Sequence, residues 1–186
     1  QTREPEPGGA KGTVAADDLT INANVTATGG NGTITLAAGD TLTLATGITV
    51  SAAGTGAITI AAGEDFTDST LDHDGLADGD ITMGLTATVQ SVSGNITLDA
   101  ADSMTIAVIN ADSDGDNTRG DVTITARGTG SNIGSILDAN VEILNITADD
   151  LTFTAKGNIG TESDPIEFIS NTAAVNFTGA GSFFGL

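Results

Sequence analysis

The chain has no cysteine, tryptophan or tyrosine, and only five lysine and arginine residues stand against 25 acidic ones. Without cysteine, disulfide cross-links and thiol chemistry are excluded. So few basic residues argue against nucleic acid as a partner, because binding to phosphates needs clustered cations that displace counterions. No apolar stretch approaches the roughly 20 residues that cross a bilayer, so we expect no insertion into membranes.

The net charge of −20 favours solubility and attracts divalent cations. The single histidine, His73, has no cysteine or second histidine to join it, which argues against a transition-metal site. No motif resembles a nucleophile with its general base, so we predict no catalytic residue and no enzymatic activity. What remains abundant is glycine, threonine and the aliphatic residues, a composition that suits closely stacked strands.

The chain repeats itself, and one signature consists of Gly, any residue, Ile or Val, and Thr. Successive copies are 24, 23, 15, 26 and 24 residues apart, the last being degenerate. The copies are GTIT at Gly32–Thr35, GAIT at Gly56–Thr59, GDIT at Gly79–Thr82, GNIT at Gly94–Thr97, GDVT at Gly120–Thr123 and LNIT at Leu144–Thr147.

A second signature alternates with the first and joins alanine and acidic residues to a hydrophobic residue followed by Thr. Its spacing suggests the same period, because Leu42 follows Leu19 by 23 residues and Leu151 follows Met104 by 47, about two periods. The copies centre on Leu19, Leu42, Phe66, Met104 and Leu151.

A period near 24 predicts an all-β fold, a parallel β-helix (solenoid) of about seven rungs. In Ile34-Thr35-Leu36, strand alternation places both hydrophobic side chains on one face and Thr on the other. One such strand cannot bury its own apolar face, but stacked rungs bury a continuous aliphatic column and leave a Thr ladder outside. An antiparallel sandwich is the alternative, and it explains the strands but not the repetition.

The ends of the chain differ from its middle. We expect a flexible arm over residues 1–13, a solenoid over 14–172 and an apolar segment over 173–186. The last segment is interpreted as a cap, as the start of a further rung cut short, or as a docking face for another subunit, since open β-helix ends expose strand edges. The candidate interface residues are Phe177, Phe183, Phe184, Leu186, Pro5 and Pro7.

Two Asp-rich segments, Asp72–Thr82 and Asp112–Thr123, each lead into a copy of the first signature, so we expect both to occupy the same kind of turn. Alternating carboxylates resemble the start of a calcium loop, in which hard oxygen atoms wrap one cation. A solvated turn is the alternative, because Asp and Gly fit tight bends. The candidate calcium ligands are Asp112, Asp114, Asp116 and Asp121 in one segment and Asp72, Asp74, Asp78 and Asp80 in the other.

The strings GTITLAAGDTLTL, SGNITLDAADSMTI and ADDLTFTAKGNIGTESDPIEF resemble the repetitive shafts of filamentous-haemagglutinin-type bacterial exoproteins and adhesins. The phrase GNIGT at Gly157–Thr161, followed by Pro165-Ile166, is particularly similar. The resemblance covers most of residues 15–168 and implies a right-handed β-helix, a secreted or cell-surface location, and a role in adhesion, biofilm or filaments.

These features favour a non-enzymatic structural protein of the cell surface, either an adhesin shaft or a subunit of a self-assembling filament. Its expected partners are further copies of itself, stacked head to tail, or neighbouring repeats, with surface glycans as a second possibility. One alternative is a calcium-dependent glycan- or ice-binding adhesion module. A more remote alternative is a carbohydrate-active β-helix enzyme.

Overall fold

The computed structural model describes residues 18–63, 79–128, 133–140 and 143–186. Across these ranges the regular elements are all strands, and the named strands pair in parallel within three sheets. The expected arm over residues 1–13, with Pro5 and Pro7, lies outside the described residues. No helix in the described ranges has the length and apolar character needed to cross a membrane.

The three sheets run along the stack as continuous ladders. Sheet A contains β1 (Leu19–Ile21), β4 (Leu42–Leu44), β7 (Ile81–Met83), β10 (Met104–Ile106) and β13 (Ile136–Asp138). Sheet B contains β2 (Val25–Ala27), β5 (Thr49–Ala52), β8 (Thr88–Ser91), β11 (Val108–Asn110), β14 (Ile146–Thr147) and β16 (Phe168–Ile169). Sheet C contains β3 (Ile34–Ala38), β6 (Ile58–Ala62), β9 (Ile96–Ala100), β12 (Val122–Ala126), β15 (Asp150–Ala155) and β17 (Thr172–Phe177).

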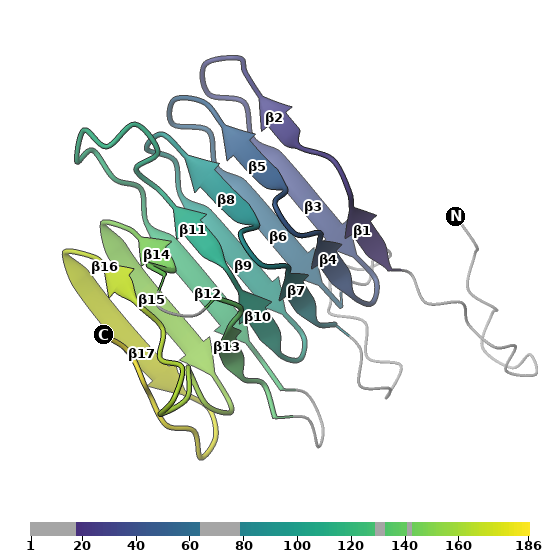
Figure 1. The fold of residues 1–186 in the computed structure, drawn as a ribbon, viewed down its shortest axis with the longest axis vertical. Helices are drawn as coiled ribbons and strands as arrows, with labels where there is room; N and C mark the ends of the chain where they lie inside the picture. The colour runs from purple at the N-terminus through teal and green to yellow at the C-terminus, as the bar shows by residue number, and fades with distance from the viewer. Residues whose placement is uncertain (1–17, 64–78, 129–132, 141–142) are drawn as a thin grey trace, which may run out of the picture.

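The chain passes through sheets A, B and C in turn, and each such circuit forms one rung of the stack. Strand numbers therefore rise by three from one neighbour to the next in every sheet, which places β1 and β17 at opposite ends (Figure 1). The sheet A position of the sixth rung is held by Ile159, and Phe183 begins a seventh above it. The predicted parallel β-helix is confirmed.

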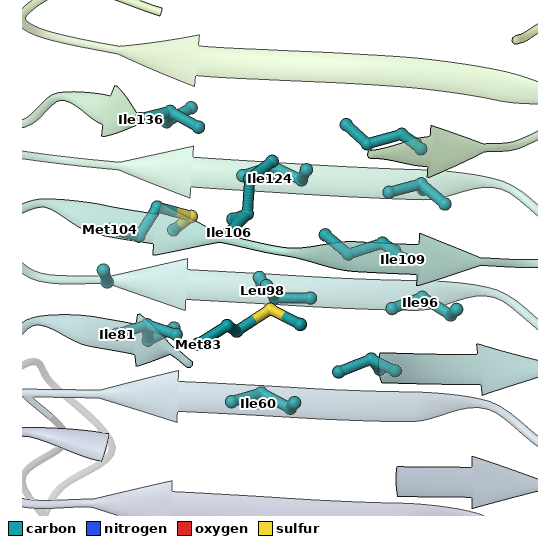
Figure 2. Packing of buried hydrophobic residues seen from close by; sticks show 14 of the residues in the cluster. Ile60, Ile81, Met83, Ile96, Leu98, Met104, Ile106, Ile109, Ile124 and Ile136 are labelled. Atoms are coloured by element: carbon teal, nitrogen blue, oxygen red, sulfur yellow. The ribbon is translucent and has the colours of Figure 1, made fainter. Parts of the chain in front are cut away.

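The core lies between the three sheets and consists of columns of inward side chains. Figure 2 shows Ile60, Leu98 and Ile124 one above another, each the middle residue of a sheet C strand. All three are completely buried. Burying an aliphatic side chain of this size contributes about 1.5–3 kcal/mol, so repetition of the column, rather than any single contact, stabilises the fold.

Threonine occupies the outward positions of the same strands. The strand registers align Thr20, Thr43, Thr82 and Thr105 on sheet A. On sheet C they align Thr35, Thr59, Thr97, Thr123 and Thr152. The expected outward Thr ladder is therefore present twice.

The 15-residue spacing in the first signature has a structural explanation. Ile81, from the copy at Gly79–Thr82, pairs with Leu42 and Met104 in sheet A, whereas Ile58 and Ile96 lie in sheet C. The short interval is thus the distance from sheet A to sheet C within one rung. Copies of the signature therefore do not all stack on one another, because similar strand sequences suit either sheet.

Two later copies also lie on other sheets than their sequences indicate. Leu151 does not continue the Leu42–Met104 column of sheet A; it pairs with Val122 in sheet C. Ile146, from the degenerate copy, lies in sheet B and pairs with Ile109. The 47-residue interval between Met104 and Leu151 is therefore not two periods of one column. Phe66 lies outside the described residues.

The glycine of the first signature marks a close approach of backbones between sheets B and C. A Cβ atom on Gly94 would lie 2.2 Å from the Gly56 carbonyl oxygen, and one on Gly120 would lie 2.3 Å from the Gly94 carbonyl oxygen. Both distances are far below van der Waals contact. Stacking at this corner therefore requires glycine in successive rungs.

Polar side chains connect successive rungs at the corners. In each case the side-chain oxygen accepts a hydrogen bond from a backbone N–H of the following rung. The side chain thereby satisfies a backbone donor at the corner that is not paired in the strand ladders. The acceptor and donor pairs include Asp18 with Thr41, Asn24 with Thr49, Asn31 with Thr55, Asp80 with Ser103, Asn95 with Asp121 and Asn158 with Ser182.

Candidate functional site

The segment between β11 and β12 forms a loop that is shaped by its own short polar residues. Gly115 and Asn117 adopt positive φ angles of 72° and 67°, a region that glycine and asparagine enter most readily. Asp114 Oδ1 accepts from the Asp116 N–H, and Asp116 Oδ1 accepts from the Thr118 N–H at 2.7 Å. These local bonds hold successive carboxylates on the inner side of the bend.

The loop brings three of the predicted calcium ligands together. One carboxylate oxygen each from Asp112, Asp114 and Asp116 lies within 4.8 Å of the other two. Asp114 and Asp116 are exposed, whereas the Asp112 side chain is only 5% exposed. Asp112 Oδ1 is buried and has no hydrogen-bond partner among the described residues. An unsatisfied carboxylate oxygen beside two others is a donor set of the hard kind that Ca²⁺ prefers.

An arginine of the same loop partly neutralises this cluster. Arg119 Nε lies 3.3 Å from Asp112 Oδ2, and the Arg119 side chain also donates to Asn117 Oδ1. The guanidinium is 17% exposed, so this ion pair is shielded from water on most sides. Asp112 Oδ1 takes no part in this ion pair. A cation at the cluster would therefore meet two exposed carboxylates and one buried oxygen atom.

The other predicted ligands are not part of this group. Asp121 belongs to the corner ladder, where its N–H donates to Asn95 Oδ1 and its Oδ1 accepts weakly from the Asp150 N–H. Asp80 precedes β7 in sheet A and Asp121 precedes β12 in sheet C, so the described ends of the two Asp-rich segments enter different sheets, contrary to the sequence expectation. The remaining candidates Asp72, Asp74 and Asp78 lie outside the described residues.

Asp80 is held as a structural acceptor. Burial raises the pKa of its carboxyl group, and the nearby Asp102 raises that pKa further, while the hydrogen bond from the Ser103 N–H opposes both. The ionised form is thus disfavoured at this corner.

A second polar corner, between sheets A and B of the fifth rung, was not foreseen from the sequence. Asn145 is completely buried; its amide donates to the Ala107 carbonyl and to Asp138 Oδ1, and its carbonyl oxygen accepts from the Glu167 N–H. Burial raises the pKa of Asp138, although hydrogen bonds from the Asn140 N–H and from Asn145 counteract it. The degenerate LNIT sequence was the one available signal of a polar residue turned inward.

The C-terminal end of the core is filled by aromatic rings. Phe183 lies with its centroid 6.0 Å from that of Phe153 and 6.2 Å from that of Phe168, an arrangement typical of favourable aromatic pairs. Phe177 remains 37% exposed and Leu186 76% exposed. The predicted interface residues therefore divide, because Phe183, although 36% exposed, packs in the aromatic cluster at the end of the core, whereas Leu186 is mostly exposed.

Comparisons of the chain with protein-family models, with curated proteins and with solved structures each gave no match. The function is therefore inferred from the residues and the fold alone.

Proposed function

We propose that the chain is a non-enzymatic extracellular structural module, an adhesin shaft or a subunit of a self-assembling surface filament. The observation that carries this proposal is the extensible stack: β3 and β17 each have a strand neighbour on one side only, at opposite ends of sheet C (Figure 1). Rungs that contact only their neighbours make a rod whose length can increase without a change of fold. The repeats, which resemble those of filamentous-haemagglutinin-type exoproteins, support the same role and a cell-surface location.

Electron microscopy of the purified protein over a range of concentrations, with and without calcium, tests this proposal. Filaments or chains of rods are the expected result. Small-angle scattering of the dilute protein gives a second measurement, since a shaft and a filament subunit should both be elongated. Compact particles that stay monomeric at every concentration would refute the structural role.

Calcium binding by Asp112, Asp114 and Asp116 is a second candidate function, favoured by the buried and unpaired Asp112 Oδ1. A cation that binds only the folded state at 100 times its dissociation constant raises the free energy of unfolding by about 2.7 kcal/mol. Thermal unfolding in CaCl₂ and in MgCl₂ measures this effect. Asp114→Asn should remove a calcium-specific shift, and Asp121→Asn is the matched control because it deletes an equal charge outside the cluster. Equal shifts in both variants would refute the site.

A further inference from the structure

Charged side chains are missing from both ends of the stack. None occurs in residues 19–39, which form the first rung, or in residues 168–186, which form the last strands and the start of the seventh rung. Of the 25 acidic residues, 21 lie between Asp40 and Glu167. Asp18 precedes β1, but its carboxylate accepts from the Thr41 N–H and so is turned toward the second rung. The middle rungs are therefore acidic, whereas the first and last rungs of the described stack, residues 19–39 and 168–186, have no charged side chain.

The same ends leave core hydrophobic residues incompletely covered. Most side chains of the inward columns in the middle rungs are buried, whereas several at the ends are only partly buried although they pack against the core. These end-rung residues are Leu19, Ile21, Val25, Ala27 and Leu36 in the first rung and Phe168 and Val175 in the last. Covering them by another rung would bury this surface further.

Hydrogen bonds between the rungs of sheet A repeat the pattern of parallel strands, in which each rung both donates to the next rung and accepts from it, as Ile21 accepts from the Ala45 N–H. The first inward residue of a rung donates its N–H to the carbonyl that precedes the equivalent residue of the next rung, as Leu19 does to Thr41, Met104 to Ser135 and Ile159 to Ser182. By this pattern a further rung at the C-terminal end would accept from the Phe183 N–H. A further rung at the N-terminal end would donate to the Asp18 carbonyl. The two ends are thus complementary to each other, which favours a heterologous contact that propagates.

We propose that the partner of each end is the opposite end of a second copy, stacked so that sheet A continues across the junction. Strand register then defines one contact between the copies. Phe183 continues the column of Ile136 and Ile159, so Phe184, the next residue, continues the neighbouring column of Thr20, Thr82 and Leu137. Phe184 of one copy therefore lies next to Thr20 of the other. Sheet C ends one rung earlier, at β17, so sheets A and B make this first contact.

This inference rests on the proposed filament role, and it specifies which surfaces of two copies meet and in which orientation. Two copies side by side would bring acidic surfaces together, and like charges repel within a Debye length of about 8 Å at physiological salt. Contact between residues 168–186 of one copy and residues 19–39 of another meets no such repulsion, because neither range contains a charged side chain. Association should therefore change little with salt, whereas lateral association would increase as salt screens the charges.

Charge substitutions in one outward column test the proposal. Phe184→Asp places a charge at one end, Thr20→Asp places it at the other, and Thr82→Asp is the matched control in a middle rung. All three positions lie outside the buried core, and circular dichroism confirms that each variant folds. Sedimentation velocity of each protein then measures association. We expect both end variants to weaken association at least tenfold and Thr82→Asp to stay within twofold of the unaltered protein.

Mixing Phe184→Asp with Thr20→Lys tests the direction, because opposite charges meet only in a head-to-tail junction and should restore association. Loss of association in Phe184→Asp but not in Thr20→Asp would indicate pairing of like ends and overturn the inference. Equal association of all variants would also overturn the inference, but it would leave the proposed filament role intact. If the unaltered protein never associates, the filament role fails and the inference fails with it.

Discussion

Replacing Ile96 by alanine tests the stacked core at its centre. Ile96 is completely buried and pairs in register with Ile58 on one side and Val122 on the other. Truncation removes three carbon atoms, a loss of about 2.4 kcal/mol at about 0.8 kcal/mol for each buried CH₂ group. Rungs that are paired along the strand on both sides cannot close the space, so a cavity term adds to this loss. We expect the free energy of unfolding to fall by about 3–4 kcal/mol.

Ile34→Ala is the matched control because Ile34 occupies the same column at the end of the stack. It pairs with Ile58 alone and is 7% exposed, so we expect a loss about 1–2 kcal/mol smaller. Urea unfolding followed by far-ultraviolet circular dichroism is the suitable assay, since the chain has no tryptophan or tyrosine. For a chain of this size Ile96→Ala should lower the Tm by roughly 6–16 °C. Losses below about 1 kcal/mol at Ile96, or equal losses at both positions, would refute the stacking account.

Gly94→Ala should destabilise the fold by at least about 2 kcal/mol, because its Cβ would lie 2.2 Å from the Gly56 carbonyl oxygen. Gly29→Ala is the control, since a Cβ at that position meets open space and should change stability little. Thermal unfolding compares the two variants. Ser91→Ala removes the hydroxyl that donates to the Gly56 carbonyl and accepts from the Gly94 N–H, so urea unfolding should show a loss of about 1–3 kcal/mol. For Asp80, a folded-state pKa above 3.8 means that its stabilising contribution is complete below that pH and is lost as pH rises through the raised pKa. Asp80→Asn should therefore gain stability relative to the unaltered protein at pH 7 but not at pH 3.5, and an equal difference at both pH values would contradict this.

The division of charge links the fold to its proposed role. Most acidic residues lie between Asp40 and Glu167, and some of them accept hydrogen bonds at the corners or form the Asp112–Asp116 cluster. The end rungs contain Thr, Asn and apolar residues instead.

Much of the architecture followed from the order of the residues. Alternation of aliphatic residues with Thr determined which side chains face the core, and recurrence near 24 residues determined that strands stack in parallel, because no isolated strand could bury its apolar face. The sequence also placed Asp112, Asp114 and Asp116 in one bend, since carboxylates two residues apart on a short loop cannot separate far.

Only the tertiary structure decided to which sheet each repeat belongs. Ile81 and Ile96 carry the same local signature, yet one lies in sheet A and the other in sheet C, because loop lengths between strands determine the register and strand sequence does not. The same reason separates Asp80 and Asp121 from the carboxylate cluster, and it turns Asn145 into the interior. Residues distant in sequence are neighbours because successive rungs stack, and which rungs and sheets they join depends on every strand and loop between them rather than on a local sequence pattern.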